Sequence, residues 1–424
     1  MGMNDITKPI RADVAVVGGG LAGLTAAALL RRNGHDVVVV EQSALGGRGR
    51  SDDRHGVVFN RGPHAVYLRG DAERVFTDLG VSLAGGPPSS HGCGLVGDRM
   101  GDLPFGPVGL ARTKLLGARG KLAAAGLMAR LGKFDTSRLG GMTFGAWLDD
   151  ADLPADARAL VEMLARVSTY ANAPDLASAD MVVGQVQRSM AFGVRYVHGG
   201  WQSIVDSLAA GLRIEQHTVR SVVRDGADVV IECADGPAIV ARTAVVALGT
   251  PGATAATLGR APFDVGPVVE AACLDLATSV PAVPGLLLGI DRPLYLSNHC
   301  PPARLAPAGT NVIHVARYLA PDDAQSPEVG RAELMAHAAR AGLSADVISD
   351  QRYLHRMTVV GALAVARTGG LAGRPTVDDS GIPGVFLAGD WVGPTGHLLD
   401  AVVASAETAA HRADTAARAA TLAR

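Results

Sequence analysis

Three glycines and one acidic residue of this chain have the spacing of a turn that binds phosphate and ribose. Gly18, Gly20 and Gly23 form the pattern G-x-G-x-x-G, and Glu41 follows at about the distance of 20 residues expected for a carboxylate that accepts hydrogen bonds from ribose hydroxyls. The first glycine allows the tight turn, the second lets backbone N–H groups approach a pyrophosphate, and the third lets a helix pack closely on a strand. This chemistry predicts a dinucleotide-binding site.

The residues around the glycines have the pattern of a strand, a helix and a second strand. Residues 14–17 form a short apolar run, residues 21–32 have the composition of a helix that Gly34 ends, and residues 36–40 form a second apolar run before Glu41. We therefore expect a β-α-β unit whose helix begins at the glycine turn. The N-terminus of that helix adds positive potential where the phosphates would lie.

The same stretch is a poor leader peptide and a poor membrane span. Asp13 precedes the apolar run, three consecutive glycines interrupt it, and Arg31 and Arg32 follow it. A signal peptide needs a basic start, and a membrane span needs about 20 apolar residues without such a break.

The net charge of −2 gives no basic field for nucleic acid. The four cysteines form no C-x-x-C pair, so we predict no metal site and no disulfide framework, and we expect a cytoplasmic protein.

The segment after Glu41 indicates which dinucleotide the turn would bind. It contains GGR at residues 46–48 and FNRGPHAVY at residues 59–67, which a plain nicotinamide-binding domain does not need. These motifs resemble the opening of the flavoprotein superfamily that contains flavin amine oxidases, protoporphyrinogen oxidases and phytoene desaturases. The resemblance implies a noncovalently bound FAD, with Arg48 along its pyrophosphate and the turn at Gly62 and Pro63 close to the flavin. An ordinary surface salt bridge is the alternative for Arg48.

The resemblance returns in residues 384–413, GVFLAGDWVGPTGHLLDAVVASAETAAHRA. We expect a strand over residues 385–388, a Gly/Pro turn and a helix from near Leu398. The resemblance implies that Asp390 contacts the ribityl and phosphate part of FAD and that the helix N-terminus points at the flavin. The alternative is that Asp390 is a solvent-exposed residue at the start of an ordinary helix. We predict His397 as the catalytic residue beside the flavin, with packing in the turn as its alternative.

A third block of the resemblance covers VRYVHGGWQSIVDSLAAGL and RIEQHTVRSVV, where a helix over about 201–210 precedes a strand near residues 218–223. In the family, a residue at the position of Val219 meets the adenine through its backbone. The predicted cofactor-binding residues are therefore Gly18, Gly20, Leu21, Ala22, Gly23, Glu41, Gln42, Gly47, Arg48, Gly62, Pro63, His64, Val219, Gly389, Asp390, Gly396, His397 and Leu398.

The three blocks are separated by two segments that we assign to a substrate domain. We predict an α/β fold in which residues 1–90, 196–262 and 354–424 form a Rossmann FAD-binding domain of the GxGxxG type. Residues 91–195 and 263–353 then form a discontinuous α+β substrate domain. Its first segment has a helical pattern, and its second alternates like an antiparallel sheet that could form the floor of a pocket over the flavin. His299 lies in this second segment, where an ordinary strand histidine is favoured over a catalytic group.

Residues 103–134 contain no acidic residue, which raises the question of a helix on a membrane surface. At 100° per residue, Lys114 and Lys121 fall opposite the other basic residues, and glycines interrupt the helical pattern. A solvated helical cap is therefore favoured, and peripheral membrane contact is the alternative. The basic residues of this segment are Arg112, Lys114, Arg119, Lys121, Arg130 and Lys133.

Two departures separate the chain from typical flavin amine oxidases. Many of those enzymes carry a late lysine that holds a water against flavin N5, whereas no lysine follows Lys133 here; His397 also stands where an aromatic residue is usual. FNRGPHAVY, GGWQSIVDSL and AGDWVG are more similar to phytoene desaturase-type dehydrogenases. We therefore predict an FAD-dependent oxidoreductase that removes hydride from a hydrophobic small molecule. An amine oxidase, a flavin-dependent isomerase and a flavin-free binding protein on the same fold are the alternatives.

Overall fold

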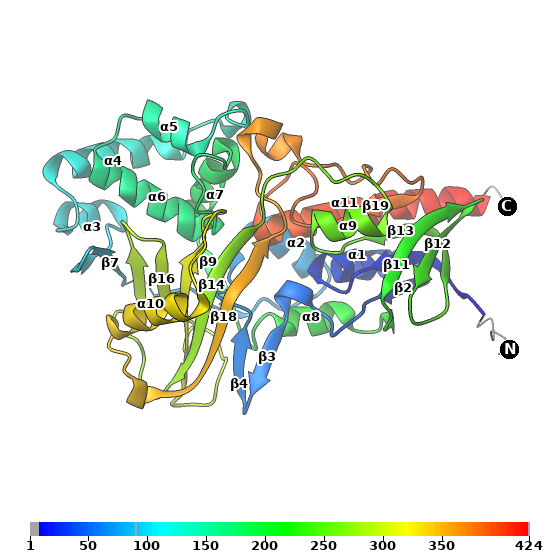
Figure 1. Ribbon diagram of the computed structural model, residues 1–424, viewed down its shortest axis with the longest axis horizontal. Helices are drawn as coiled ribbons and strands as arrows, with labels where there is room; N and C mark the ends of the chain where they lie inside the picture. Colours follow the sequence, from blue (N-terminus) through cyan, green and yellow to red (C-terminus); the bar gives the residue numbers. More distant parts are fainter. Residues whose placement is uncertain (1–7, 90, 423–424) are drawn as a thin grey trace.

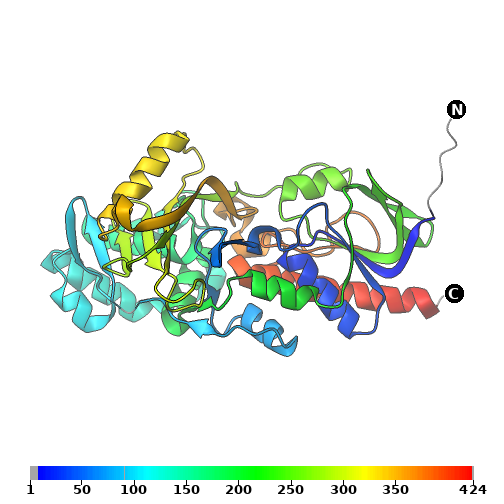
Figure 2. The same cartoon turned by 90° about the horizontal axis from the view of Figure 1, so that it is seen from below.

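The computed structural model describes residues 8–89 and 91–422. The molecule is elongated, with two large β-sheets along its length (Figure 1). The first and last described residues lie at the end that holds the first sheet, and a group of helices occupies the opposite end (Figure 2).

The first sheet is built from the apolar runs that flank the glycine turn. Its strands follow the order β10-β2-β1-β13-β12-β11, and β19 also pairs with β13. The β10-β2-β1-β13 ladder and the β13–β19 pair are parallel, whereas β11, β12 and β13 pair antiparallel. Buried parallel strands need apolar residues on both faces, which explains the unbroken valine runs. The strands are β1 (Ile10–Val17), β2 (Val37–Val40), β10 (Arg213–Glu215), β11 (Val219–Asp225), β12 (Asp228–Cys233), β13 (Ile239–Val246) and β19 (Val385–Leu387).

Helices α1 (Leu21–Arg32) and α11 (Leu398–Leu422) pack against each other and against this sheet. The buried face of α11 is rich in alanine, including Ala406, Ala409 and Ala413, so the two helices can approach closely. Other helices associated with this part of the molecule are α2 (Asp71–Asp78), α8 (Gln202–Ala209) and α9 (Pro251–Thr257).

The second sheet has the order β18-β14-β17-β16-β15-β7-β8 and is antiparallel except for the β15–β7 pair. Helix α10 (Pro327–Ala339) packs on β14, β16, β17 and β18 and closes an apolar core with them. The strands are β7 (Cys93–Val96), β8 (Arg99–Asp102), β14 (Val269–Thr278), β15 (Leu286–Gly289), β16 (Leu294–Asn298), β17 (Asn311–Tyr318) and β18 (Ile348–Val360).

The helices at the far end form a cap beside the second sheet (Figure 1). They are α3 (Gly106–Arg112), α4 (Ala118–Leu131), α5 (Phe144–Asp150), α6 (Ala155–Thr169) and α7 (Ala179–Phe192). The remaining short strands form two small sheets, ordered β3-β4 and β5-β9-β6. They are β3 (Ser51–Arg54), β4 (Val57–Asn60), β5 (Val66–Tyr67), β6 (Gly85–Gly86) and β9 (Val194–Val197). Single 3-10 turns are η1 (Gly47–Gly49), η2 (Thr136–Arg138), η3 (Ala345–Val347), η4 (Ala366–Thr368) and η5 (Gly370–Gly373).

The predicted α/β class with a Rossmann-type sheet is confirmed. The structure adds β7 and β8 to the second sheet from a segment for which the sequence indicated mainly helices. Strand β18 also continues past the predicted domain boundary between residues 353 and 354, so the chain leaves the second sheet only after Val360. The division into two domains stays a prediction. Within residues 8–422, we find no helix with the length and apolar character needed to cross a membrane.

Candidate functional site

The three glycines of the turn have different surroundings. Gly18 has a φ of +106°, and a Cβ there would lie 2.4 Å from the Ala247 carbonyl oxygen. A Cβ on Gly23 would lie 1.9 Å from the Gly18 carbonyl oxygen, so this glycine lets α1 pack against the turn. A Cβ on Gly20 would have no described heavy atom within 4 Å beyond its chain neighbours. The first and third glycines therefore serve packing, and the second leaves open space.

Glu41 directly follows β2 and turns its carboxylate back toward the glycine turn. Its Oε2 accepts a hydrogen bond from the backbone N–H of Gly19 at 2.8 Å. Its Oε1 accepts hydrogen bonds from the Ser43 backbone N–H at 2.9 Å and the Ser43 hydroxyl at 3.0 Å. These contacts fix the carboxylate at the cavity wall. A carboxylate oxygen can accept more than one hydrogen bond, so Glu41 keeps acceptor capacity for ribose hydroxyls.

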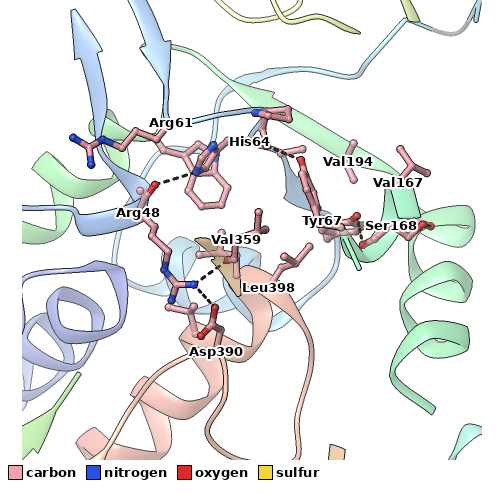
Figure 3. A pocket seen from close by; sticks show the side chains of 18 of the residues that line it. Arg48, Arg61, His64, Tyr67, Val167, Ser168, Val194, Val359, Asp390 and Leu398 are labelled. Atoms are coloured by element: carbon pink, nitrogen blue, oxygen red, sulfur yellow. Dashed lines mark hydrogen bonds and ion pairs between the residues drawn. The ribbon is translucent and has the colours of Figure 1, made fainter. Parts of the chain in front are cut away.

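An ion pair between Arg48 and Asp390 joins the first and last sequence blocks (Figure 3). Arg48 Nη1 donates to Asp390 Oδ2 at 2.6 Å and to the Val359 carbonyl oxygen at 2.9 Å. Asp390 is 1% exposed and also accepts from the Gly361 backbone N–H. Because Asp390 is buried at the cavity wall, it is not a solvated helix start, and its pair with Arg48 is not an ordinary surface salt bridge. Contact of either side chain with a cofactor phosphate stays a prediction.

His64 is held against the cavity by backbone carbonyl groups on both sides of its ring. Nδ1 lies 2.8 Å from the Gly62 carbonyl oxygen. Nε2 lies 3.2 Å from the Arg48 carbonyl oxygen, a contact that Figure 3 shows. Burial lowers the pKa of His64 to about 4, so near neutral pH the uncharged ring can donate to one of these carbonyls only. The ring also packs edge-on against Trp201, with centroids 4.4 Å apart. His64 therefore presents a fixed, uncharged surface to the cavity.

His397 has a different position from the one expected for a residue beside the flavin. It is 2% exposed, its Nε2 donates to the Thr169 carbonyl oxygen at 2.9 Å, and it is absent from the described cavity wall. Burial lowers the pKa of His397 to about 4. Its neighbour Leu398 does line the cavity. The geometry favours packing in the turn, and the catalytic role of His397 stays a prediction without support from this arrangement.

One continuous cavity of about 1720 Å³ brings most of the predicted residues together. Drug-sized ligand pockets are typically about 300 to 1,000 Å³, so this cavity has room for more than one such molecule. We call the part lined by the predicted cofactor-binding residues the cofactor half. The predicted residues on its wall are Gly18, Gly20, Leu21, Ala22, Glu41, Gln42, Gly47, Arg48, Pro63, His64, Val219, Gly389, Asp390 and Leu398. Those absent from the described wall are Gly23, Gly62, Gly396 and His397.

Several other residues line this part of the cavity beside the predicted ones. Thr250 precedes α9, and Ala253 and Thr257 belong to that helix. The sequence ALGTP contains a signal for them, because Pro251 at the start of a helix follows the apolar run of β13. Thr358 and Val359 of β18 also line the cavity, and no local pattern indicates their position.

The remainder of the cavity, which we call the cap half, is lined by the helical cap and the second sheet. Its wall is mainly aliphatic and aromatic, and includes Ala125, Met128, Leu160, Met163, Leu164, Val167, Tyr170, Tyr196, Leu286, Tyr295 and Leu354. The described wall of the whole cavity contains three carboxylates, Glu41, Asp52 and Asp390. Glu41 and Asp390 belong to the cofactor half, and Asp52 is paired with Arg352 at 2.5 Å. The described wall of the cap half therefore offers no unpaired acidic side chain to a cationic ligand.

Comparisons with known proteins agree with this architecture. The sequence pattern of the NAD(P)-binding Rossmann-like domain matches residues 16–79. A curated relative, an uncharacterized protein in the nifH2 3′ region of Methanothermococcus thermolithotrophicus, is 41% identical over 58 residues, and the match spans 57% of that protein and 14% of this chain.

Solved structures show the same fold over nearly the whole chain. An oxidoreductase from Methanosarcina mazei has a TM-score of 0.74 at 18% identity, covering 94% of this chain and 99% of its own. Cyclohexylamine oxidase from Brevibacterium oxydans has a TM-score of 0.72 at 16% identity, covering 97% and 100%. A Rab GDI from Plasmodium falciparum has a TM-score of 0.59 at 12% identity, covering 96% and 98%. The chain therefore has the same fold as these two oxidoreductases, and a protein named as a GDI shares that fold.

Proposed function

We propose that this chain is an FAD-dependent oxidoreductase that removes hydride from a carbon atom of an uncharged, hydrophobic small molecule. The observation that carries the proposal is the single cavity, in which a dinucleotide cradle continues into an apolar cap half. Bound FAD would supply the acceptor for a hydride from a substrate C–H bond. The chain itself supplies orientation and exclusion of water.

The cofactor half fits FAD in its open space and in its hydrogen-bonding groups. Gly20 leaves room for a phosphate, and α1 begins beside it without a side-chain cap, so its first N–H groups are available to an anion. Glu41 would hold the ribose, and Val219, which lines the cavity, would meet the adenine as the family resemblance implies. His64, Val359 and Leu398 would bound the flavin end of the cavity (Figure 3).

The cap half supports a neutral substrate more than an amine. A protonated amine transferred into an apolar wall needs a paired charge, because an isolated buried ion is costly. The described wall there has no free carboxylate, whereas its aliphatic and aromatic side chains suit an isoprenoid or polyene. An amine oxidase is the second candidate, and the shared fold with cyclohexylamine oxidase is what favours it.

The reaction class can be tested by anaerobic absorbance of the FAD-loaded protein with a panel of polyenes, isoprenoids and amines. The proposal predicts loss of the oxidised flavin bands with a neutral compound and no loss with amines. Bleaching by amines alone would favour the amine oxidase. Bound flavin without bleaching but with rearranged product would favour the isomerase, and failure to bind flavin at all would favour the binding protein.

We also propose that the edge of the cap half formed by Phe105, Met190 and Phe192 lies against an anionic membrane surface. Phe105, Met190 and Phe192 line the cavity and are nonetheless exposed. Leu122 is 77% exposed on α4, one turn before the wall residue Ala125. Phe105 and Leu122 belong to residues 103–134, which carry basic but no acidic residues, and exposed apolar side chains in such a segment are typical of contact with anionic lipid.

Co-sedimentation with vesicles tests this membrane contact. Binding to phosphatidylglycerol vesicles should exceed binding to phosphatidylcholine vesicles, and Leu122→Glu should reduce it. Val329→Glu is the matched control, because Val329 is 55% exposed on α10, outside the described cavity wall. Equal sedimentation of all proteins with and without anionic lipid would contradict the contact.

A further inference from the structure

A cluster of hydroxyl and imidazole groups interrupts the apolar wall of the cap half. Tyr295, Ser297 and His299 alternate along β16 and the residue after it, so their side chains share one face of the second sheet. Tyr196 of β9 reaches the same place: its hydroxyl lies 2.9 Å from Ser297 Oγ and 3.2 Å from the Tyr295 hydroxyl. Its ring stacks on His299 with centroids 3.6 Å apart. Tyr196, Tyr295 and His299 are all on the cavity wall.

The cluster has hydrogen-bonding capacity that the described residues do not fill. His299 is fully buried, and its Nδ1 has no hydrogen-bond partner in the described part of the chain. Its Nε2 lies 3.4 Å from the Tyr295 hydroxyl, a long contact for a hydrogen bond. Leaving a buried polar group without a partner is unfavourable, so a site of this kind favours a ligand that completes the network.

A row of polar residues crosses the second sheet from Ser297 of the cluster, and the charged residues in this row are paired with one another. Ser297, His314, Asp275 and Arg352 lie opposite one another on β16, β17, β14 and β18. His314 Nδ1 lies 2.5 Å from Asp275 Oδ1, and Arg352 Nε donates to Asp275 Oδ2 at 2.9 Å. The buried carboxylate therefore has its countercharge within the row and offers none to the cavity.

The cluster itself is uncharged near neutral pH. Burial, together with the neighbouring His314 and His64, places the pKa of His299 well below its ordinary value. Burial raises the pKa values of the Tyr196 and Tyr295 phenols. Neutral hydroxyl and imidazole groups can both donate and accept hydrogen bonds, so they suit a neutral oxygen group better than an ammonium or a carboxylate.

We propose that Tyr295 and His299, supported by Tyr196 and Ser297, bind one uncharged oxygen group, a hydroxyl or a carbonyl, of an otherwise hydrophobic substrate. This inference rests on the proposed function, because it assigns the substrate's polar group to the cap half of the same cavity. It narrows the substrate class from uncharged, hydrophobic small molecules in general to hydrophobic alcohols, aldehydes or ketones.

Binding of three ligands with one carbon skeleton tests the proposal without any turnover. Farnesol, farnesene and farnesylamine are titrated into the purified full-length protein by isothermal calorimetry. One net hydrogen bond corresponds to about a two- to tenfold preference, so farnesol should bind that much tighter than farnesene. Farnesylamine should bind no tighter than farnesene, and the alcohol preference should be unchanged between pH values of about 6 and 9, where His299 stays neutral.

Two tyrosine variants locate the preference. Tyr295→Phe removes one hydroxyl of the cluster and should bring farnesol and farnesene to equal affinity. Tyr170→Phe is the matched control, since Tyr170 also lines the cavity but its hydroxyl donates to the Pro63 carbonyl oxygen at 2.6 Å. That variant should keep the alcohol preference, and thermal melting of each variant verifies that it is folded.

The proposal is overturned if the wild type binds alcohol and hydrocarbon equally, binds the amine most tightly, or binds none of the three. It is also overturned if folded Tyr295→Phe keeps the full preference. The flavin absorbance of the same samples is read separately, so loss of the flavin assignment is distinguishable from loss of the oxygen-binding subsite.

Discussion

Replacing Gly20 by alanine adds one methyl group to the cofactor half and tests where the phosphates would lie. Gly20 has φ −77° and ψ 177°, an extended conformation that alanine adopts without strain. The added Cβ would have no described heavy atom within 4 Å beyond its chain neighbours. A glycine-to-alanine change at such a compatible position stabilises a protein by about 0.4 to 1 kcal/mol, so Gly20→Ala should leave the melting temperature unchanged or slightly raised.

The effect on FAD affinity should be much larger than the effect on stability. A methyl group at this position would occupy the space through which a phosphate approaches the backbone N–H groups at the start of α1. Hydrogen bonds to charged groups contribute about 1.5 to 3 kcal/mol each. Loss of one such bond corresponds to FAD binding that is roughly ten- to a hundredfold weaker.

The assay is titration of the apoprotein with FAD, followed by flavin fluorescence, together with a thermal melt. Gly23→Ala is the matched control, because its Cβ would lie 1.9 Å from the Gly18 carbonyl oxygen and the backbone must shift. That variant should lower the melting temperature, whereas Gly20→Ala should lower only the affinity. A folded Gly20→Ala protein with wild-type FAD affinity would refute the placement of the phosphates against Gly20.

Three further predictions concern Glu41, His397 and a group of three histidines. Glu41→Ala should weaken FAD binding roughly tenfold or more, by loss of charge-assisted hydrogen bonds to ribose; unchanged affinity in equilibrium dialysis would contradict this role. His397→Ala should lower the melting temperature and leave the flavin reduction potential unchanged, because the imidazole donates to Thr169 away from the cavity; a lower potential would restore the catalytic assignment. Burial lowers the pKa of His64, His337 and His397 to about 4, from an ordinary value of 6.5. Between these two pH values the unfolded chain binds more protons than the folded chain, so the free energy of unfolding measured by urea denaturation should fall as the pH falls from 6.5 to about 4. His337→Gln should make this fall smaller, and a variant with the same pH profile as the wild type would contradict the assignment.

Local signals were sufficient to predict the glycine turn and its neighbours. Helix α1 spans Leu21–Arg32 as predicted, because the glycine turn defines its start and a polar segment with Gly34 follows its end. Strand β2 begins one residue later than predicted, and α11 begins at Leu398 as expected. These elements are specified by residues close together in the sequence, so apolar runs and glycines were enough.

Side-chain directions set by distant residues could not be predicted. The sequence places His397 next to the start of α11, but its direction is decided by the Thr169 carbonyl, 228 residues away. The pairing of His314, Asp275 and Arg352 likewise depends on the register of three strands from separate parts of the chain. The sequence indicated an ordinary strand histidine at His299. Only the structure shows that its Nδ1 has no partner among the described residues, that its Nε2 lies 3.4 Å from the Tyr295 hydroxyl, and that the residue lines the cavity.

The central claim is that the cofactor half binds FAD, and the absorbance spectrum of the purified protein tests it most directly. The protein is measured as isolated and again after incubation with FAD and removal of the excess by gel filtration. The account predicts oxidised flavin bands that travel with the protein at close to one flavin per chain and are released on denaturation. A folded protein that shows no flavin bands in either state would contradict it.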